Sequence, residues 1–180
     1  MTEARRLLQH FLAALAYRTQ KSLRDAPPGY SDYRAEANSR TPHELMWHMS
    51  SLMGYARTML NGGTFEPPWL PSFADEVARF HSVLQQLLND FANPQLTAQI
   101  TDEQFLQGPL ADAMTHAGQL AMLRRLAGAP VPSEDFIYAK IESDNVTAEQ
   151  AAPAAPDLWW RPDRSPEPTP QQRRQMEIDS

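Results

Sequence analysis

Helical spacing is clearest in the stretch Leu110-Ala-Asp-Ala-Met-Thr-His-Ala-Gly-Gln-Leu-Ala-Met-Leu-Arg-Arg-Leu126. Residues three or four positions apart lie on the same side of an α-helix. One such side carries Ala113, His116, Leu120, Leu123 and Ala127. The two arginines at 124 and 125 and the glycine at 128 are typical of a helix C-terminus. We therefore predict a helix over about residues 103–127, with its start between Glu103 and Gly108.

A second helix is predicted upstream, over about residues 41–61. Thr41 precedes Pro42 and is followed three residues later by Glu44, which is the pattern of a capping box with proline at the first helical position. Asn61-Gly-Gly63 ends the segment. The apolar side predicted from the spacing consists of Leu45, His48, Leu52, Tyr55 and Met59. This assignment points His48 toward the protein interior.

Two further segments have the same period. The first covers about residues 2–23, ends before Asp25-Ala-Pro-Pro-Gly29, and has an apolar side made of Leu7, Leu8, Phe11, Leu12 and Leu15. The other covers about residues 72–92, and its apolar side consists of Val77, Phe80, Leu84, Leu87, Leu88 and Phe91. Four amphipathic segments without an alternating strand pattern predict an all-α fold, a four-helix bundle.

The C-terminal part of the chain has a different composition. We expect residues 1–145 to form the bundle, closed by a strap that starts near Pro130, and residues 146–180 to form an extended Pro/Ala-rich tail. Trp159 and Trp160 hold a large apolar area in this polar tail. We expect them to pack on the bundle or on a partner subunit, which favours a homodimer.

Composition excludes several classes of function. The chain has 180 residues, enough for one domain, and no cysteine, so it offers no disulfide, thiolate ligand or thiol nucleophile. Its net charge of −6, without a long basic run, argues against nucleic-acid binding. No apolar run is long enough for a membrane span, and the first residues lead into an amphipathic pattern instead of a signal peptide. These features predict a soluble cytoplasmic protein.

Three side chains suggest a metal site. Asp112 and His116 are four residues apart, so both can reach one point beside their helix. His48 on a neighbouring helix would complete a set of two imidazoles and one carboxylate, which suits a divalent transition metal and leaves coordination positions open. Spacing alone also allows a second interpretation, in which Asp112 interacts with the dipole at a helix start and His116 donates a hydrogen bond to a backbone carbonyl.

Two motifs resemble a known family. Leu45-Met-Trp-His48-Met, together with His116-Ala-Gly-Gln-Leu-Ala-Met-Leu-Arg-Arg-Leu-Ala-Gly-Ala-Pro130, resembles the DinB-like superfamily of bacterial four-helix bundles, over about residues 7–141. That family's usual metal site takes one histidine from the second helix and two from the fourth. The matching positions here are His48, Asp112 and His116, so a carboxylate replaces one imidazole. The resemblance thus implies a divalent ion at these residues, and zinc, nickel, iron and manganese all suit them.

The resemblance also implies a class of activity. The superfamily includes thiol-dependent S-transferases and an isomerase, in which a metal with open positions acts as a Lewis acid and activates a small-molecule thiol. This implies a metal-dependent enzyme, with no catalytic residue assigned beyond the ligands. The alternative is a non-catalytic bundle that binds a metal or small molecule, or a stress-associated interaction module. The superfamily's name refers to induction by DNA damage and implies no DNA binding.

The remaining polar and aromatic candidates have simpler interpretations. We expect His10, His43 and His81 at the surface, since each falls outside the predicted apolar side of its helix. Gln119, one turn after His116, would either support the metal site or pack between helices. Tyr55 would either line a pocket or belong to the core.

Overall fold

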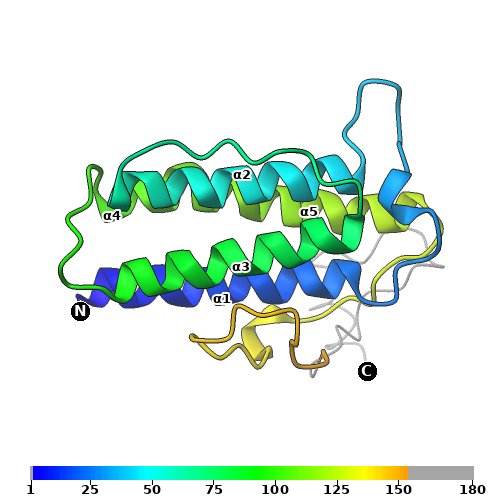
Figure 1. Cartoon of the computed structure of the whole chain (residues 1–180). Coiled ribbons are helices and arrows are strands. Elements are labelled where there is room, and N and C mark those ends of the chain that lie inside the picture. Colours follow the sequence, from blue (N-terminus) through cyan, green and yellow to red (C-terminus); the bar gives the residue numbers. More distant parts are fainter. Residues whose placement is uncertain (1, 154–180) are drawn as a thin grey trace, which may run out of the picture. The chain divides into compact units, whose positions relative to one another are not determined.

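The computed structural model describes residues 2–153, which form helices and no extended strand (Figure 1). The long helices are α1 (Glu3–Leu23), α2 (Pro42–Asn61), α3 (Phe73–Ala92) and α5 (Ala111–Leu126), and a short α4 (Asp102–Phe105) precedes α5. Helix α2 packs against α3 and α5, and α1 packs against the same two helices. The predicted all-α class is confirmed.

Capping residues set the helix boundaries as the sequence indicated. Thr41 and Glu44 form the capping box: the Glu44 N–H donates to Thr41 Oγ1, and the Thr41 N–H donates to Glu44 Oε2 at 2.7 Å. Gly62 and Gly128 follow the ends of α2 and α5 with φ values of 72° and 78°. Glycine adopts this left-handed conformation without steric cost. The predicted ends of the helices are therefore close to the observed ones.

The last predicted helix is interrupted. Leu106–Leu110 form a π-helical turn between α4 and α5, where Gly108 has non-helical angles (φ −91°, ψ −107°). Pro109 lacks the N–H that a continuous α-helix would use. The prediction of one helix over 103–127 was wrong in this respect. Asp112 consequently lies in the first turn of α5.

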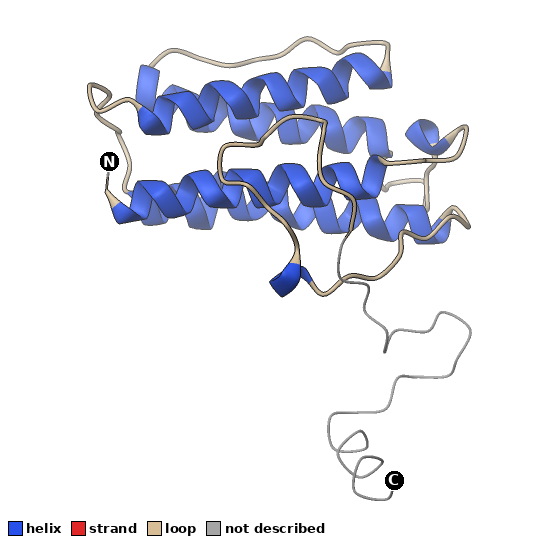
Figure 2. Ribbon diagram, turned by 90° about the horizontal axis from the view of Figure 1, so that it is seen from below, coloured by secondary structure: helices blue, strands red, loops and turns tan. Residues whose placement is uncertain are grey.

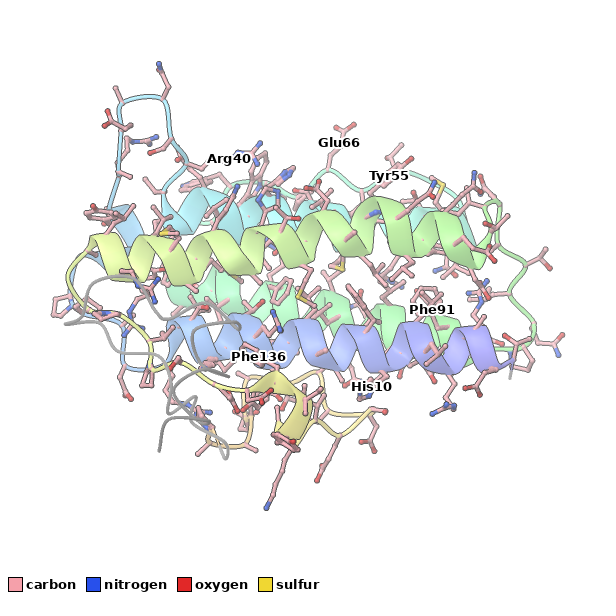
Figure 3. The ribbon with its side chains drawn as sticks, turned by 180° about the vertical axis from the view of Figure 1, so that it is seen from behind. His10, Arg40, Tyr55, Glu66, Phe91 and Phe136 are labelled. Atoms are coloured by element: carbon pink, nitrogen blue, oxygen red, sulfur yellow. The ribbon has the colours of Figure 1, made fainter. Side chains whose placement is uncertain are left out.

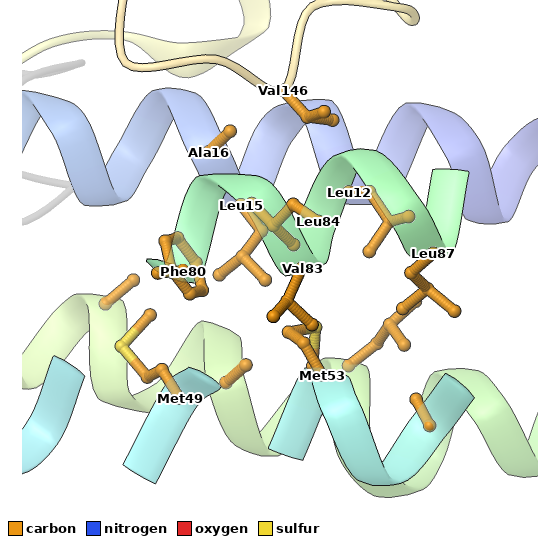
Figure 4. Close-up of a cluster of buried hydrophobic side chains, with 14 of the residues drawn as sticks. Leu12, Leu15, Ala16, Met49, Met53, Phe80, Val83, Leu84, Leu87 and Val146 are labelled. Atoms are coloured by element: carbon orange, nitrogen blue, oxygen red, sulfur yellow. The ribbon is translucent and has the colours of Figure 1, made fainter. Parts of the chain in front are cut away.

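The core lies between the long helices (Figure 4). Leu12 and Leu15 of α1 and Phe80 and Leu84 of α3 are fully buried, as predicted. Leu7 is 55% exposed, so its assignment to the apolar side of α1 was wrong. The next residue, Leu8, is buried as predicted. The apolar sides of α1 and α3 were otherwise correctly placed.

The buried side of α2 differs from the predicted one. It consists of Leu45, Met46, Met49, Met53, Ala56 and Leu60. Leu52 and Met59 are only partly buried, and Tyr55 is exposed, so it neither lines a pocket nor joins the core. Helix α2 has apolar residues on two adjacent sides, and its packing against α3 and α5 determines which side is buried. His48 is left at the border of the core.

Glycine 54 allows a close contact between α2 and the loop that follows it. A Cβ atom at this position would lie 2.0 Å from Phe65 Cδ1 and 2.3 Å from Phe65 Cγ. We expect Gly54→Ala to displace the whole ring and to lower the free energy of unfolding by about 1–2 kcal/mol, because the steric cost exceeds the gain in helix propensity. Urea unfolding measures the difference.

Gly118 in α5 provides the matched control. No heavy atom lies within 4 Å of a Cβ built there. Gly118→Ala should therefore raise stability by up to about 1 kcal/mol through helix propensity alone. Equal effects of the two substitutions would contradict the assigned role of Phe65.

Residues 140–152 belong to the same compact unit as the helices and cross α1 and α3 (Figure 2). Val146 is fully buried beside these helices (Figure 4). The His81 ring nitrogen Nδ1 donates to the Val146 carbonyl at 2.7 Å, and Arg24 donates to the Gln150 carbonyl at 2.7 Å. His81 is therefore buried and tethers this segment, so the expectation of a surface position was wrong. The sequence did not indicate that a C-terminal segment covers it.

Burial lowers the pKa of His81 below its ordinary value of 6.5. The unfolded chain then binds a proton more readily than the folded one, so His81 lowers stability as the pH falls from about 6.5 through the folded-state pKa. We expect His81→Gln, whose amide also donates, to unfold with a smaller drop in midpoint between pH 7 and pH 5 than the wild type. A midpoint that drops as much in His81→Gln as in the wild type between pH 7 and pH 5 would contradict this role of His81.

Outside this unit, residues 132–139 contain a single helical turn, Phe136–Tyr138. The predicted packing of Trp159 and Trp160, and with it the homodimer, concerns residues outside the described ones. No helix within residues 2–153 has the length and apolar character needed to cross a bilayer.

Candidate metal centre

The three predicted ligands come together between α2 and α5. His48 lies in the second turn of α2, and Asp112 and His116 lie one turn apart on α5. Asp112 Oδ1 is 3.2 Å from His116 Nε2, and Asp112 Oδ2 is 3.9 Å from His48 Nε2. The two imidazole rings meet edge to face, with centroids 4.8 Å apart. One ligand atom from each residue thus lies within 4.8 Å of the other two.

Exposure increases across the group. The His116 side chain is 10% exposed, His48 is 24% exposed and Asp112 is 48% exposed. Asp112 lies in the first turn of α5, directly after the π-helical turn, and its carboxylate is at the surface. A cation is therefore not needed to offset burial of its carboxylate. The exposed carboxylate instead leaves one side of the group open to solvent.

The tautomer of His116 is set by Gln119. Nδ1 of His116 lies 2.7 Å from Gln119 Oε1, and an amide oxygen only accepts, so Nδ1 carries the proton. Nε2 is then the lone-pair atom of the neutral ring. This nitrogen is buried and makes no hydrogen bond, although it faces Asp112. The alternative in which a backbone carbonyl satisfies His116 is wrong: its partner is the Gln119 side chain.

The surroundings of His48 favour its neutral form. Partial burial, the positive charge of Arg40 and the nearby His116 lower its pKa, while the Asp112 carboxylate opposes this shift. A neutral imidazole is the form that binds metals. The two histidines and the carboxylate are thus poised to offer lone pairs to one point.

One of these distances already suits a shared ion. Ligand atoms at about 2.1 Å from a metal in tetrahedral or octahedral geometry are about 3.0–3.4 Å apart. The Asp112–His116 separation of 3.2 Å falls in this range, whereas the Asp112–His48 separation is 3.9 Å and the group as a whole spans up to 4.8 Å, so a shared ion requires His48 to move toward α5. No other group of three His, Cys, Asp or Glu side chains in residues 2–153 is comparably placed.

The other histidines lie apart from this centre. His10 is exposed, as predicted, and its ring contacts Ser143 Oγ at 2.9 Å. His43 is 5% exposed, so its predicted surface position was wrong. The loop between α2 and α3 brings Trp69 over its ring, with centroids 4.1 Å apart, and Phe73 contacts it edge to face. The spacing of residues along α2 could not indicate that Trp69 covers the His43 ring.

Gln119 and Arg40 are the two further residues that bear on the centre. The helical spacing indicated Gln119, whereas nothing in the sequence indicated Arg40. Outer partners of metal-bound histidines typically change affinity by about 10–100-fold. We expect Gln119→Leu to weaken zinc binding by about tenfold without unfolding the protein, because His116 would lose its fixed tautomer. Isothermal titration measures this change, and an unaltered affinity would contradict the role given to Gln119.

Comparisons of the chain with protein-family models, with curated proteins and with solved structures found no match. The geometry described above is therefore the basis for inferring a function.

Proposed function

We propose that this chain is a divalent-metal-binding protein with a DinB-like four-helix bundle, and that His48, Asp112 and His116 hold the ion. The observation that carries the proposal is the buried Nε2 atom of His116, which has no hydrogen-bond partner and faces the Asp112 carboxylate 3.2 Å away. Gln119 holds the ring with this lone pair directed at the site. A bound cation would satisfy it.

The proposal includes a metal-dependent enzyme of the thiol S-transferase type. A divalent ion with open positions would supply Lewis acidity and lower the pKa of a bound thiol. The chain contains no cysteine, so the thiol would come from a small molecule. Two observations support an accessible site: Asp112 is half exposed, and the segment of residues 140–152 contacts α1 and α3, away from the ligands.

Metal titration tests the first part of the proposal. Protein purified without a metal-affinity tag is dialysed against chelator and titrated with zinc, nickel, manganese and ferrous iron. We expect one ion per chain for at least one of these metals, accompanied by a rise in the unfolding midpoint, because an ion that binds only the folded state stabilises it. A protein that binds none of the four would overturn the proposal.

A cobalt-substituted protein tests the second part. Adding mercaptoethanol should produce a thiolate-to-cobalt absorption band if the ion keeps a position open to a thiol. The same band should be absent when mercaptoethanol is replaced by ethanol. A protein that holds cobalt but shows no such band would favour the non-catalytic metal-binding alternative.

A further inference from the structure

A pocket of about 320 Å³ lies beside His116. His116 and Gln119 form one part of its lining, Leu45, Met122 and Leu123 form an apolar part, and Arg40 stands at the end of the loop that leads into α2. Figure 3 labels Arg40 where α2 and α5 run side by side. This volume is at the small end of the range for small-molecule sites, about 300–1,000 Å³.

Arg40 provides an uncompensated positive charge at this pocket. The nearby carboxylate of Glu44 pairs with Arg34 at 3.0 Å, and it also caps α2. Arg40 is exposed and makes no hydrogen bond or ion pair with any residue of the part that the structure describes. A guanidinium placed in this way is suited to pair with an anionic group of a ligand.

The apolar lining of the pocket further narrows the chemical class of ligand that would fit. Leu45 and Leu123 are buried and give the pocket a fixed wall, whereas Met122 is 52% exposed and flexible. An inorganic anion would leave this wall in contact with water. A ligand with both an anionic group and a short apolar body would cover the wall and pair with Arg40 at once.

We propose that this pocket binds a small organic anion, with its carboxylate against Arg40 and its apolar body on Met122 and Leu123. The further step, that such a molecule is the substrate class of the metal centre, rests on the function proposed above. His116 borders both the pocket and the ligand triad, so a molecule seated here lies beside the reacting position.

The test compares three probes of equal length on the metal-free protein. Hexanoate, 1-hexanol and hexylamine are titrated while the NMR signals of the Met122 methyl group and the His116 ring are followed. We expect saturable shifts with hexanoate, with a dissociation constant on the order of 1 mM for so small a molecule. Hexanol should bind more weakly and hexylamine weakest. Equal affinity for hexanoate and hexanol, or tighter binding of hexylamine, would overturn the proposal.

Two arginine variants test whether the positive charge of Arg40 contributes to hexanoate binding. Arg40→Gln should weaken hexanoate binding by about tenfold and leave hexanol binding unchanged, since only the charge-assisted contact is lost. Arg6→Gln carries the same charge change on the exposed start of α1 and should alter neither. An unchanged hexanoate affinity in Arg40→Gln would also overturn the proposal.

Because the titrations use metal-free protein, they test the pocket independently of the proposed metal site. Hexanoate binding that depends on Arg40, in a protein that binds no metal, would support the pocket and remove the metal function. A protein that binds metal but shows no Arg40-dependent hexanoate binding would keep the metal site and overturn the pocket.

Discussion

Replacing His116 by alanine is expected to weaken metal binding by at least about a hundredfold while leaving a folded helical protein. A ligand contributes more than the outer partners of a site, whose loss costs about 10–100-fold. The His116 side chain makes one hydrogen bond, to Gln119, and its second nitrogen has none, so its removal leaves little unsatisfied. Alanine also has the higher helix propensity. Zinc titration and circular dichroism of the same sample measure both effects.

His10→Ala is the matched control, because His10 is exposed, lies outside the metal centre and has its ring hydrogen-bonded to Ser143. Its zinc affinity should equal that of the wild type. A second measurement is the unfolding midpoint with and without zinc: an ion present at about 100 times its dissociation constant stabilises the wild type by about 2.7 kcal/mol. This increase should disappear in His116→Ala. If the variant still bound zinc with wild-type affinity, the triad would not be the metal site.

Replacing Arg124 by methionine is expected to destabilise the protein by about 3–5 kcal/mol, the largest loss among the substitutions considered. Arg124 is 5% exposed, and its guanidinium donates to four carbonyls: Ser22 at 2.9 Å, Arg24 at 2.8 Å, Asp25 at 3.3 Å and Ala129 at 2.9 Å. It therefore joins the C-terminal end of α1 to that of α5. Methionine fills a similar volume and leaves these acceptors without a donor, at about 1–3 kcal/mol for each buried group.

Arg6→Met provides the comparison, since Arg6 is exposed at the start of α1 and its ion pair with Glu3 lies in solvent, where such pairs contribute little. Its effect should stay within about 0.5 kcal/mol, as for most surface substitutions. Chemical unfolding of both variants measures the difference. A loss below about 1 kcal/mol in Arg124→Met would show that water replaces the guanidinium at these carbonyls.

Local chemistry was sufficient to predict most of the helix boundaries and the three candidate ligands. The capping box at Thr41 and the glycines at 62 and 128 fix chain conformation through neighbouring atoms, so their effect can be read without knowing the partners. The four-residue spacing of Asp112 and His116 likewise determines that both reach one side of α5. His48 was proposed as the third ligand because it lies on a neighbouring predicted helix, and the family resemblance pointed to the same position.

Tertiary packing decided which side of each helix is buried and how the centre is exposed. Helix α2 has apolar residues on two adjacent sides, and only the positions of α3 and α5 select the methionines for the core and leave His48 at its border. Asp112 in the first turn of α5 lies at the surface, and the segment around Val146 buries His81. These outcomes depend on contacts between residues that are far apart in the chain. The free energy of burial at such contacts depends on how closely the side chains fit together, and the spacing of apolar residues within one helix does not determine that fit.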